Sequence, residues 1–299
     1  MSLLLQLNDL VEGHVTKRPS KVIKTPYVAD VKCIQTDEEV LAHTAALGCC
    51  GLADVNASVL MTLSNNKTKS KSKSKPKNKA GMKCAYTIYL SILQEGEHCQ
   101  IVGIQPKLAE TLVENALKSN LLSRLRNVRS YRREVVMYIE DKVDSRFDFS
   151  GIDENGVPFI MEVKNVPLAD YEDVSAKERQ NMDFTGRPYN SKVAYFPDGY
   201  RKKPKDTISP RALKHIKELT LIKTECSSEK NIRCIMCYVI QRTDVSRFQP
   251  SVIDPEYRTA FKTAVESGVE IITLVVSWSK EGEAYFVRDD LPITEFDCV

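Results

Sequence analysis

Three side chains near the middle of the chain have the types and spacing of a cation-dependent hydrolytic site. Asp148 is followed by Glu162 and Lys164, and a single residue separates the last two. Two carboxylates about 5 Å apart across a strand pair repel each other unless a positive charge neutralises them. Mg²⁺ or Mn²⁺ would do so, because a hard divalent cation takes oxygen ligands from one or two carboxylates and keeps several waters. A neighbouring lysine can orient an attacking water or stabilise charge that grows on a phosphate.

The elements that must position these residues are two strands joined by a short turn, from Val143 to Val166. Apolar and polar residues alternate on both sides of the turn. One face should hold the apolar set, namely Phe147, Phe149, Phe159, Met161 and Val163. The opposite face should hold the polar set, namely Arg146, Asp148, Glu162 and Lys164.

The length of the turn decides whether the charged residues meet. A two-residue loop, Asn155-Gly156, would pair Asp148 with Val163 and put the aspartate on the wrong face. A three-residue loop that begins at Glu154 would instead pair Asp148 with Glu162. We expect the three-residue loop, because only that register gathers the polar residues.

An aspartate followed by Glu-x-Lys on an adjacent strand is the layout of the PD-(D/E)xK nucleases. So short a motif arises often by chance. The same three residues also fit a solvated sheet face that carries an ordinary Glu–Lys pair.

Composition and length indicate an intracellular, soluble protein of two domains. The chain has 299 residues, 42% of them hydrophobic, and a net charge of +3. Seven lysines between Lys67 and Lys79 leave the remainder slightly acidic. Nine scattered cysteines and no export signal favour a reducing compartment, cytoplasm or nucleus. No apolar run approaches the eighteen residues of a membrane span.

The paired cysteines predict buried structural residues and not a metal site. Cys234 and Cys237 have the spacing of half a zinc knuckle, but they lie in an apolar run typical of a buried strand. No second pair of Cys or His residues lies at the distance along the sequence that a zinc finger requires. The same interpretation covers Cys49-Cys50.

Residues 15–105 predict a small all-β domain. Short β-type runs at 21–29, 29–34, 59–63, 86–93 and 100–104 are separated by turn-forming residues, and an OB-like barrel fits their number and size. The lysine-rich segment lies between two of these strands, so we expect a disordered loop at 65–82. It could solubilise the protein, bind phosphates or act as a nuclear-localisation signal.

Residues 106–299 predict an α/β domain, a mixed sheet flanked by helices. Helices are expected at 106–119, 209–221 and 255–267, with prolines at their starts. Strands are expected at 192–196, 232–240 and 269–278, besides the central hairpin and the strand that precedes it. A polar surface loop should join the hairpin to residue 192.

Two further groups of polar residues flank the hairpin. An arginine-rich segment contains Arg132 and Arg133, and Glu134 follows as either a third carboxylate of the site or a partner for the arginines. Gln241 and Arg242 come directly after an apolar strand, a position that commonly lines a ligand crevice in α/β folds.

Several short motifs in a fixed order resemble the sugar fermentation stimulation protein family, SfsA. They are Arg132 to Val135, Ser145 to Phe149, Glu162 to Val166, Phe196 to Asp198, Lys214 with His215, Val239 to Phe248, Asp254 to Tyr257, and Gly268 to Glu270. The resemblance runs from about Arg18 to Pro292 and is dense from Arg132 onward. Departures occur at Pro210 and Ala212, and segments 169–191 and 199–208 are longer than the family pattern.

The resemblance implies an OB-like domain followed by a PD-(D/E)xK nuclease-like domain, and a protein that binds nucleic acid, DNA more than RNA. It implies a catalytic triad of Asp148, Glu162 and Lys164, with Glu134 and Gln241 in support and the two carboxylates as metal ligands. Candidate contacts to nucleic acid are Arg146, Lys214, Arg242, Arg132 and Arg133. The expected function is cleavage of DNA or RNA with Mg²⁺ or Mn²⁺; the alternative is a DNA-binding, regulatory protein that does not cleave.

Overall fold

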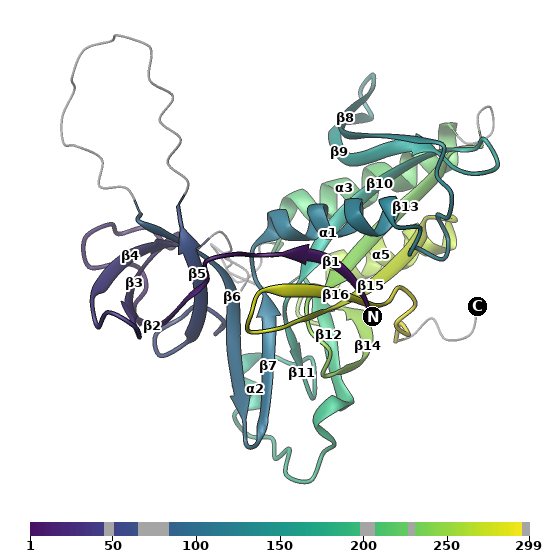
Figure 1. Ribbon diagram of the computed structural model, residues 1–299. Helices are drawn as coiled ribbons and strands as arrows, with labels where there is room; N and C mark the ends of the chain where they lie inside the picture. Colours follow the sequence, from purple (N-terminus) through teal and green to yellow (C-terminus); the bar gives the residue numbers. More distant parts are fainter. Residues whose placement is uncertain (45–50, 65–83, 198–206, 227–230, 295–299) are drawn as a thin grey trace, which may run out of the picture.

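The computed structural model describes residues 1–44, 51–64, 84–197, 207–226 and 231–294 (Figure 1). Within these ranges the strands form three sheets, of seven, six and three strands. The lysine-rich segment expected to be a loop and the Cys49-Cys50 pair lie outside the described residues. None of the described helices is long and apolar enough to cross a membrane.

The seven-stranded sheet is the centre of the C-terminal part. Its strands lie in the order β1 (Ser2–Gln6), β16 (Glu283–Arg288), β15 (Glu270–Trp278), β13 (Arg233–Ile240), β10 (Pro158–Val166), β9 (Val143–Ile152) and β8 (Ser130–Ile139). The central strands β10, β13 and β15 are parallel, and the pairs towards both edges are antiparallel. The mixed α/β fold expected from the sequence is therefore confirmed for this part.

Helices cover both faces of this sheet. Helix α1 (Pro106–Lys118) packs on one face, and α3 (Pro210–Leu221) and α5 (Pro255–Glu266) pack on the other (Figure 1). Strand β13 is buried on both sides: Ile235 and Val239 belong to the α1 core, and Met236 and Tyr238 belong to the α3–α5 core. A strand covered on both faces reads as a continuous apolar run, which is why this segment shows no alternation.

The two cysteines of β13 are buried, as predicted. Cys234 and Cys237 have no exposed surface and point to opposite faces of the sheet, because they are three residues apart on a strand. They therefore cannot bind one metal ion together.

Local capping fixes the starts of the two helices on the α3–α5 face. Ser209 accepts a hydrogen bond from the backbone N–H of Ala212, and Asp254 accepts one from Tyr257 at 3.2 Å. Proline follows each cap at the first helical position, where its missing N–H does no harm. Both helices begin within one residue of the expected position.

The six-stranded sheet is the core of the N-terminal part. It has the order β4 (Glu39–His43), β3 (Val28–Cys33), β2 (Val11–Lys17), β5 (Ser58–Leu63), β6 (Tyr86–Glu95) and β7 (His98–Gly103). Strand β4 also pairs in parallel with β6, through Ala42–Tyr86 and His43–Thr87. The hydrogen-bonded neighbours therefore run from β2 through β3, β4, β6 and β5 and return to β2.

The N-terminal strands differ in part from the expectation. Residues 21–29 were expected to form a strand, but most of them form a loop, because Ser20 and the backbone N–H of Lys21 donate to the buried carboxylate of Asp30. Strands β2 and β4 had no prediction. The six-stranded sheet begins at Val11, before residue 15, where the N-terminal domain was expected to start. Strand β1 precedes it in the sequence but belongs to the seven-stranded sheet.

The segment between the hairpin and residue 192, which was expected to be a loop, contributes one strand to a small third sheet. This sheet consists of β11 (Ala169–Asp170), β12 (Lys192–Phe196) and β14 (Val245–Pro250), with the short helices α2 (Ala176–Arg179) and η1 (Tyr189–Ser191) between the first two strands. Strand β12 was expected, but in the main sheet. A helical turn η2 (Ile222–Cys226) extends α3.

Candidate metal centre

The turn between β9 and β10 has the predicted three-residue loop. The backbone N–H of Asp153 donates to the carbonyl of Val157 at 2.9 Å, and the ladder continues to Phe149 opposite Met161. Continued by one residue, this register would place Asp148 opposite Glu162, but the ladder ends before that pair. The predicted three-residue turn is therefore confirmed, and so is its register as far as Phe149.

The two strands part at Asp148, which the alternation pattern did not predict. Phe149 packs in the α1 core, whereas Phe147 packs in the α3–α5 core, so the expectation of one shared face was wrong. The ladder with β10 ends at Phe149, and the ladder with β8 skips Glu134, whose φ is 53°. Strand β9 thus changes from the α1 core to the α3–α5 core at Asp148. In Figure 1 the β8–β9 hairpin stands apart from the rest of the sheet.

Asp148 occupies the gap that the parting strands leave. One of its oxygens, Oδ2, accepts a hydrogen bond from the backbone N–H of Val163 at 2.7 Å in place of a strand partner. Burial, followed by the charge of Glu162, raises the pKa of Asp148 to about 7, although Val163 and Lys164 oppose the shift. The carboxylate therefore lacks a counter-charge of sufficient strength.

Glu162 is almost fully buried, and its two oxygens have different surroundings. The residue is 2% exposed, and Oε1 accepts hydrogen bonds from Lys164 Nζ and His215 Nδ1. Oε2 is buried and, within the described residues, has no hydrogen-bond partner. Burial would raise the pKa of Glu162, but Lys164 and His215 outweigh it and hold the pKa below its ordinary value. The group is therefore ionised, with one uncompensated oxygen.

The carboxylate oxygens of Asp148 and Glu162 are suitable ligands for a hard divalent cation. A buried carboxylate oxygen without a partner is costly, and a cation bound between it and Asp148 would relieve both groups. Among the described residues no cluster of three or more His, Cys, Asp or Glu side chains has metal-binding geometry. Two carboxylates suffice for Mg²⁺, which keeps several waters, whereas zinc sites usually need three or four protein ligands.

His215 is the member of this cluster that the sequence did not bring forward as a site residue. The residue is 4% exposed, and its ring meets the ring of Phe147 edge-on at 5.8 Å. On α3 it follows Ala212 by three residues and precedes Leu219 by four, the spacing of the buried helix face. A search for polar residues on that face would have found it.

Gln241 lies on the other face of the sheet from Glu162. Its side chain is fully buried, donates to Asn165 Oδ1 at 2.7 Å and accepts from Trp278 Nε1 at 2.7 Å. Its backbone carbonyl accepts from the N–H of Gly103 at 3.4 Å. The structure therefore places Gln241 at the junction between the two halves of the chain, and not beside the carboxylates.

Substitution of Gly103 by alanine should destabilise this junction. An added methyl group would stand 2.3 Å from Gln241 Oε1 and 2.7 Å from Trp278 Nε1, so the buried amide would have to move. Overpacking of this kind costs about 1–3 kcal/mol, which a urea titration can measure. Gly96→Ala is the control, because its methyl meets no atom within 4 Å and only its φ of 57° is unfavourable. A loss no greater than that of Gly96→Ala would contradict the packing argument.

Arg242 is also a structural residue. Its Nε and Nη2 each lie 2.6 Å from an oxygen of Asp244, and the side chain is 4% exposed. Lys192 shares Asp244 at 3.0 Å and reaches Glu95 of β6 at 2.9 Å. The network joins the third sheet to the N-terminal part, and it leaves Arg242 no open face for a phosphate.

The remaining predicted residues lie on the surface around the cluster. Glu134 is exposed and pairs at 3.4 Å with Arg146 of β9, and not with the arginines that precede it in the sequence, which were its expected partners. Arg133 bridges Glu110 and Glu114 of α1, each at 2.7 Å. Arg132 is exposed. Lys214 is about half exposed, and its Nζ donates to the carbonyl of Asp144 at 2.6 Å.

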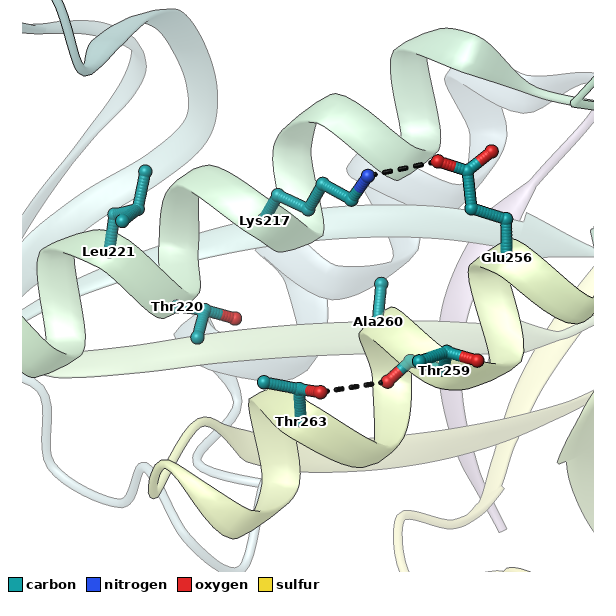
Figure 2. A pocket seen from close by; sticks show the side chains of 7 residues that line it. All are labelled: Lys217, Thr220, Leu221, Glu256, Thr259, Ala260 and Thr263. Atoms are coloured by element: carbon teal, nitrogen blue, oxygen red, sulfur yellow. Dashed lines mark hydrogen bonds and ion pairs between the residues drawn. The ribbon is translucent and has the colours of Figure 1, made fainter.

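A cavity of about 510 Å³ lies elsewhere, between α3 and α5 (Figure 2). Its charged residues, Lys217 and Glu256, pair with each other at 3.0 Å. Its threonine hydroxyls donate to carbonyls of their own helices, as Thr263 does to Thr259 at 3.0 Å. Because its polar groups are already paired, the groove offers no reactive side chain.

Comparisons with known proteins agree on one family. A model of the sugar fermentation stimulation protein RE domain matches residues 107–177 and 184–282. A sugar fermentation stimulation protein homolog of Crocosphaera subtropica is 28% identical over 285 residues, which cover 94% of this chain and 95% of the relative. One of Jannaschia sp. is 32% identical over 182 residues, 60% of this chain and 61% of the relative.

A solved structure shares the fold. The structure of Pyrococcus furiosus SfsA in complex with Ca²⁺ superposes with a TM-score of 0.68 at 21% sequence identity. The match covers 98% of this chain and 99% of the other, so the N-terminal sheet and the seven-stranded sheet have counterparts there.

Proposed function

This chain belongs to the sugar fermentation stimulation protein family, and from that premise we propose that it is a divalent-cation-dependent phosphodiesterase that acts on nucleic acid. The observation that carries the proposal is the buried Oε2 of Glu162, which has no hydrogen-bond partner among the described residues. The charge of Glu162 contributes to the raised pKa of Asp148, and Lys164 donates to the other oxygen of Glu162. A solvated sheet face with an ordinary ion pair would leave no buried carboxylate oxygen without a donor. The presence of Ca²⁺ with the Pyrococcus furiosus relative supports a cation site in this fold.

Each residue of the cluster has a separate role in the proposal. Asp148 and Glu162 would hold Mg²⁺ or Mn²⁺, which supplies Lewis acidity and makes a bound water more acidic. Lys164, whose side chain is 12% exposed, would position the attacking water or stabilise charge on the phosphate. Glu134 and Gln241 take no part in this proposal, because neither contacts the cluster in the described structure.

The finer fold assignment rests on the arrangement of the elements. We infer a PD-(D/E)xK-like domain, because the acidic residues lie where an antiparallel hairpin joins the parallel strands β10 and β13, between α1 and α3. We also infer an OB-like barrel in the N-terminal part. Its strands form a closed circuit in the order β2, β3, β4, β6, β5 and back to β2, and β4 and β6 are parallel. This arrangement supports the inference.

Exposed basic residues near the cluster supply the contacts to nucleic acid in this proposal. Arg146 and Lys214 are each more than half exposed, and Arg132 lies on the same hairpin as Arg146. In the N-terminal part the rings of Tyr27 and His43 stack at 6.5 Å, and Tyr27 is 41% exposed. Aromatic rings of this kind can stack on unpaired bases, and basic side chains bind the backbone.

A cleavage assay tests the proposal. End-labelled single- and double-stranded DNA and RNA are incubated with the full chain and Mg²⁺, Mn²⁺ or EDTA. We expect cleavage with either cation, none with EDTA, and DNA as the better substrate. Binding without cleavage under every condition would favour the alternative, a DNA-binding protein that does not cleave.

Cation binding should depend on pH around neutrality. Because the pKa of Asp148 is about 7 in the cation-free protein, binding must displace a proton below that pH. Affinity for Mn²⁺ should therefore fall by up to about tenfold per pH unit below 7 and level off above it. Calorimetric titrations at pH 6, 7 and 8 measure this, and a constant affinity over the range would contradict the assignment of Asp148 as a ligand.

A further inference from the structure

Both carboxylates of the cluster have one oxygen engaged by the protein. Asp148 accepts from Val163 through Oδ2, and Glu162 accepts through Oε1 from both Lys164 and His215. A carboxylate most often bridges two metal ions by placing one oxygen on each. The arrangement therefore presents one oxygen of each residue, Oδ1 of Asp148 and Oε2 of Glu162.

The two oxygens of Glu162 differ in their hydrogen bonds, and this difference indicates which oxygen is available to a cation. Both oxygens belong to a residue that is 2% exposed, yet two donors converge on Oε1 and none of the described residues donates to Oε2. Two donors would satisfy a buried carboxylate better if they were shared between its oxygens. Their convergence on one oxygen indicates that the other is kept for a ligand.

His215 is held rigidly enough to impose this orientation. The helix that carries it is fixed to β9, because the buried Glu218 accepts from the backbone N–H of Asp144 at 2.9 Å and from the hydroxyl of Ser145. The imidazole itself packs against Phe147. A carboxylate can only accept, so Nδ1 of His215 must carry the hydrogen in this contact.

We propose that His215 is a positioning residue that directs Oε2 of Glu162 towards the cation and, together with Lys164, limits the site to a single divalent ion. This rests on the proposed function, since it concerns the same site. Removal of His215 frees the carboxylate to rotate about its last side-chain bond. Partners that orient a ligand in this way typically contribute 10–100-fold to metal affinity.

Three substitutions separate positioning from general structural support. In His215→Asn the amide nitrogen takes the position of Nδ1 and can still donate to Oε1. In His215→Gln the amide lies one bond further along the side chain and misses it. His215→Leu fills the space against Phe147 without any donor.

The measurement is calorimetric titration of the full chain with Mn²⁺ at pH 8, with a thermal melt of each cation-free variant as a check on folding. We expect one Mn²⁺ per wild-type chain, a 10–100-fold loss of affinity in His215→Gln and His215→Leu, and affinity within about threefold of wild type in His215→Asn. Should the leucine variant not fold, the comparison of the asparagine and glutamine variants decides.

The outcomes are distinguishable. Two ions per wild-type chain, equal affinity in all variants, or equal losses in the asparagine and glutamine variants would each overturn the role of His215. A wild-type chain that takes up no Mn²⁺ would instead overturn the proposed function itself.

Discussion

Lys164→Ala should lower the rate of phosphodiester cleavage by a factor on the order of 10²–10³, the usual effect of removing one electrostatic group from a catalytic site. The lysine is held against Glu162 at the edge of the cluster, with 12% of its side chain exposed, so it can reach a phosphate beside the cation. Single-turnover cleavage of labelled DNA with Mg²⁺ measures the effect.

Cation binding should survive this substitution, which distinguishes a catalytic lysine from a structural one. Loss of a positive charge next to Glu162 leaves Mn²⁺ affinity equal to that of wild type or greater, because two like charges no longer compete for one carboxylate. Lys262→Ala is the matched control, since this lysine of α5 is 67% exposed and belongs to another surface. A cleavage rate in Lys164→Ala equal to that of the control would remove Lys164 from the mechanism.

Asp148→Asn should abolish cation binding and cleavage and yet stabilise the cation-free protein. The pKa of Asp148 is raised to about 7 in the folded protein, mainly by burial and then by Glu162. In the unfolded chain an aspartate titrates near pH 3.9. The ionised carboxylate therefore destabilises the folded state above pH 7, and asparagine removes that penalty. We expect a gain on the order of 2 kcal/mol at pH 8, since one pKa unit corresponds to about 1.4 kcal/mol. Part of the gain is offset because the N–H of Val163 then donates to a neutral amide oxygen, a weaker acceptor than a carboxylate.

The pH dependence of this gain is a stringent check. Between about pH 4 and pH 7 the folded protein holds a proton that the unfolded chain has lost, so wild-type stability falls as the pH rises. The advantage of Asp148→Asn should thus be greatest above pH 7 and vanish near pH 4. Urea titrations in EDTA measure it, with Asp144→Asn, an exposed residue of the same strand, as the control. A wild type more stable than Asp148→Asn at pH 8 would show that the carboxylate pair is not strained.

Features determined by neighbouring residues could be predicted from the sequence. The turn at Glu154 fixed the register of β9 and β10, and the Ser-Pro and Asp-Pro pairs fixed the starts of α3 and α5. These depend on backbone chemistry within a few residues, where the sequence determines the outcome.

Features that depend on distant contacts could not be predicted in the same way. Strand β13 is apolar on both faces, so its pattern does not say on which side Gln241 emerges; its hydrogen bonds to Asn165 and Trp278 decide this. The reversal at Asp148 follows from helices on opposite faces of the sheet that draw Phe147 and Phe149 apart. His215 joins the cluster only because α3 packs beside β10, 53 residues away in sequence.

The pairing of β1 with β16 ties the two ends of the chain together. Ser2 lies opposite Phe286, and Gln6 lies opposite Glu283. The backbone groups of β1 are paired only when two strands from distant parts of the sequence meet, a closure of unusually long sequence range. Separating the chain at residue 105 would strip the C-terminal half of this outer strand and leave β16 as an open edge, which invites association between copies. A cut at residue 105 therefore does not divide the chain into two independent units.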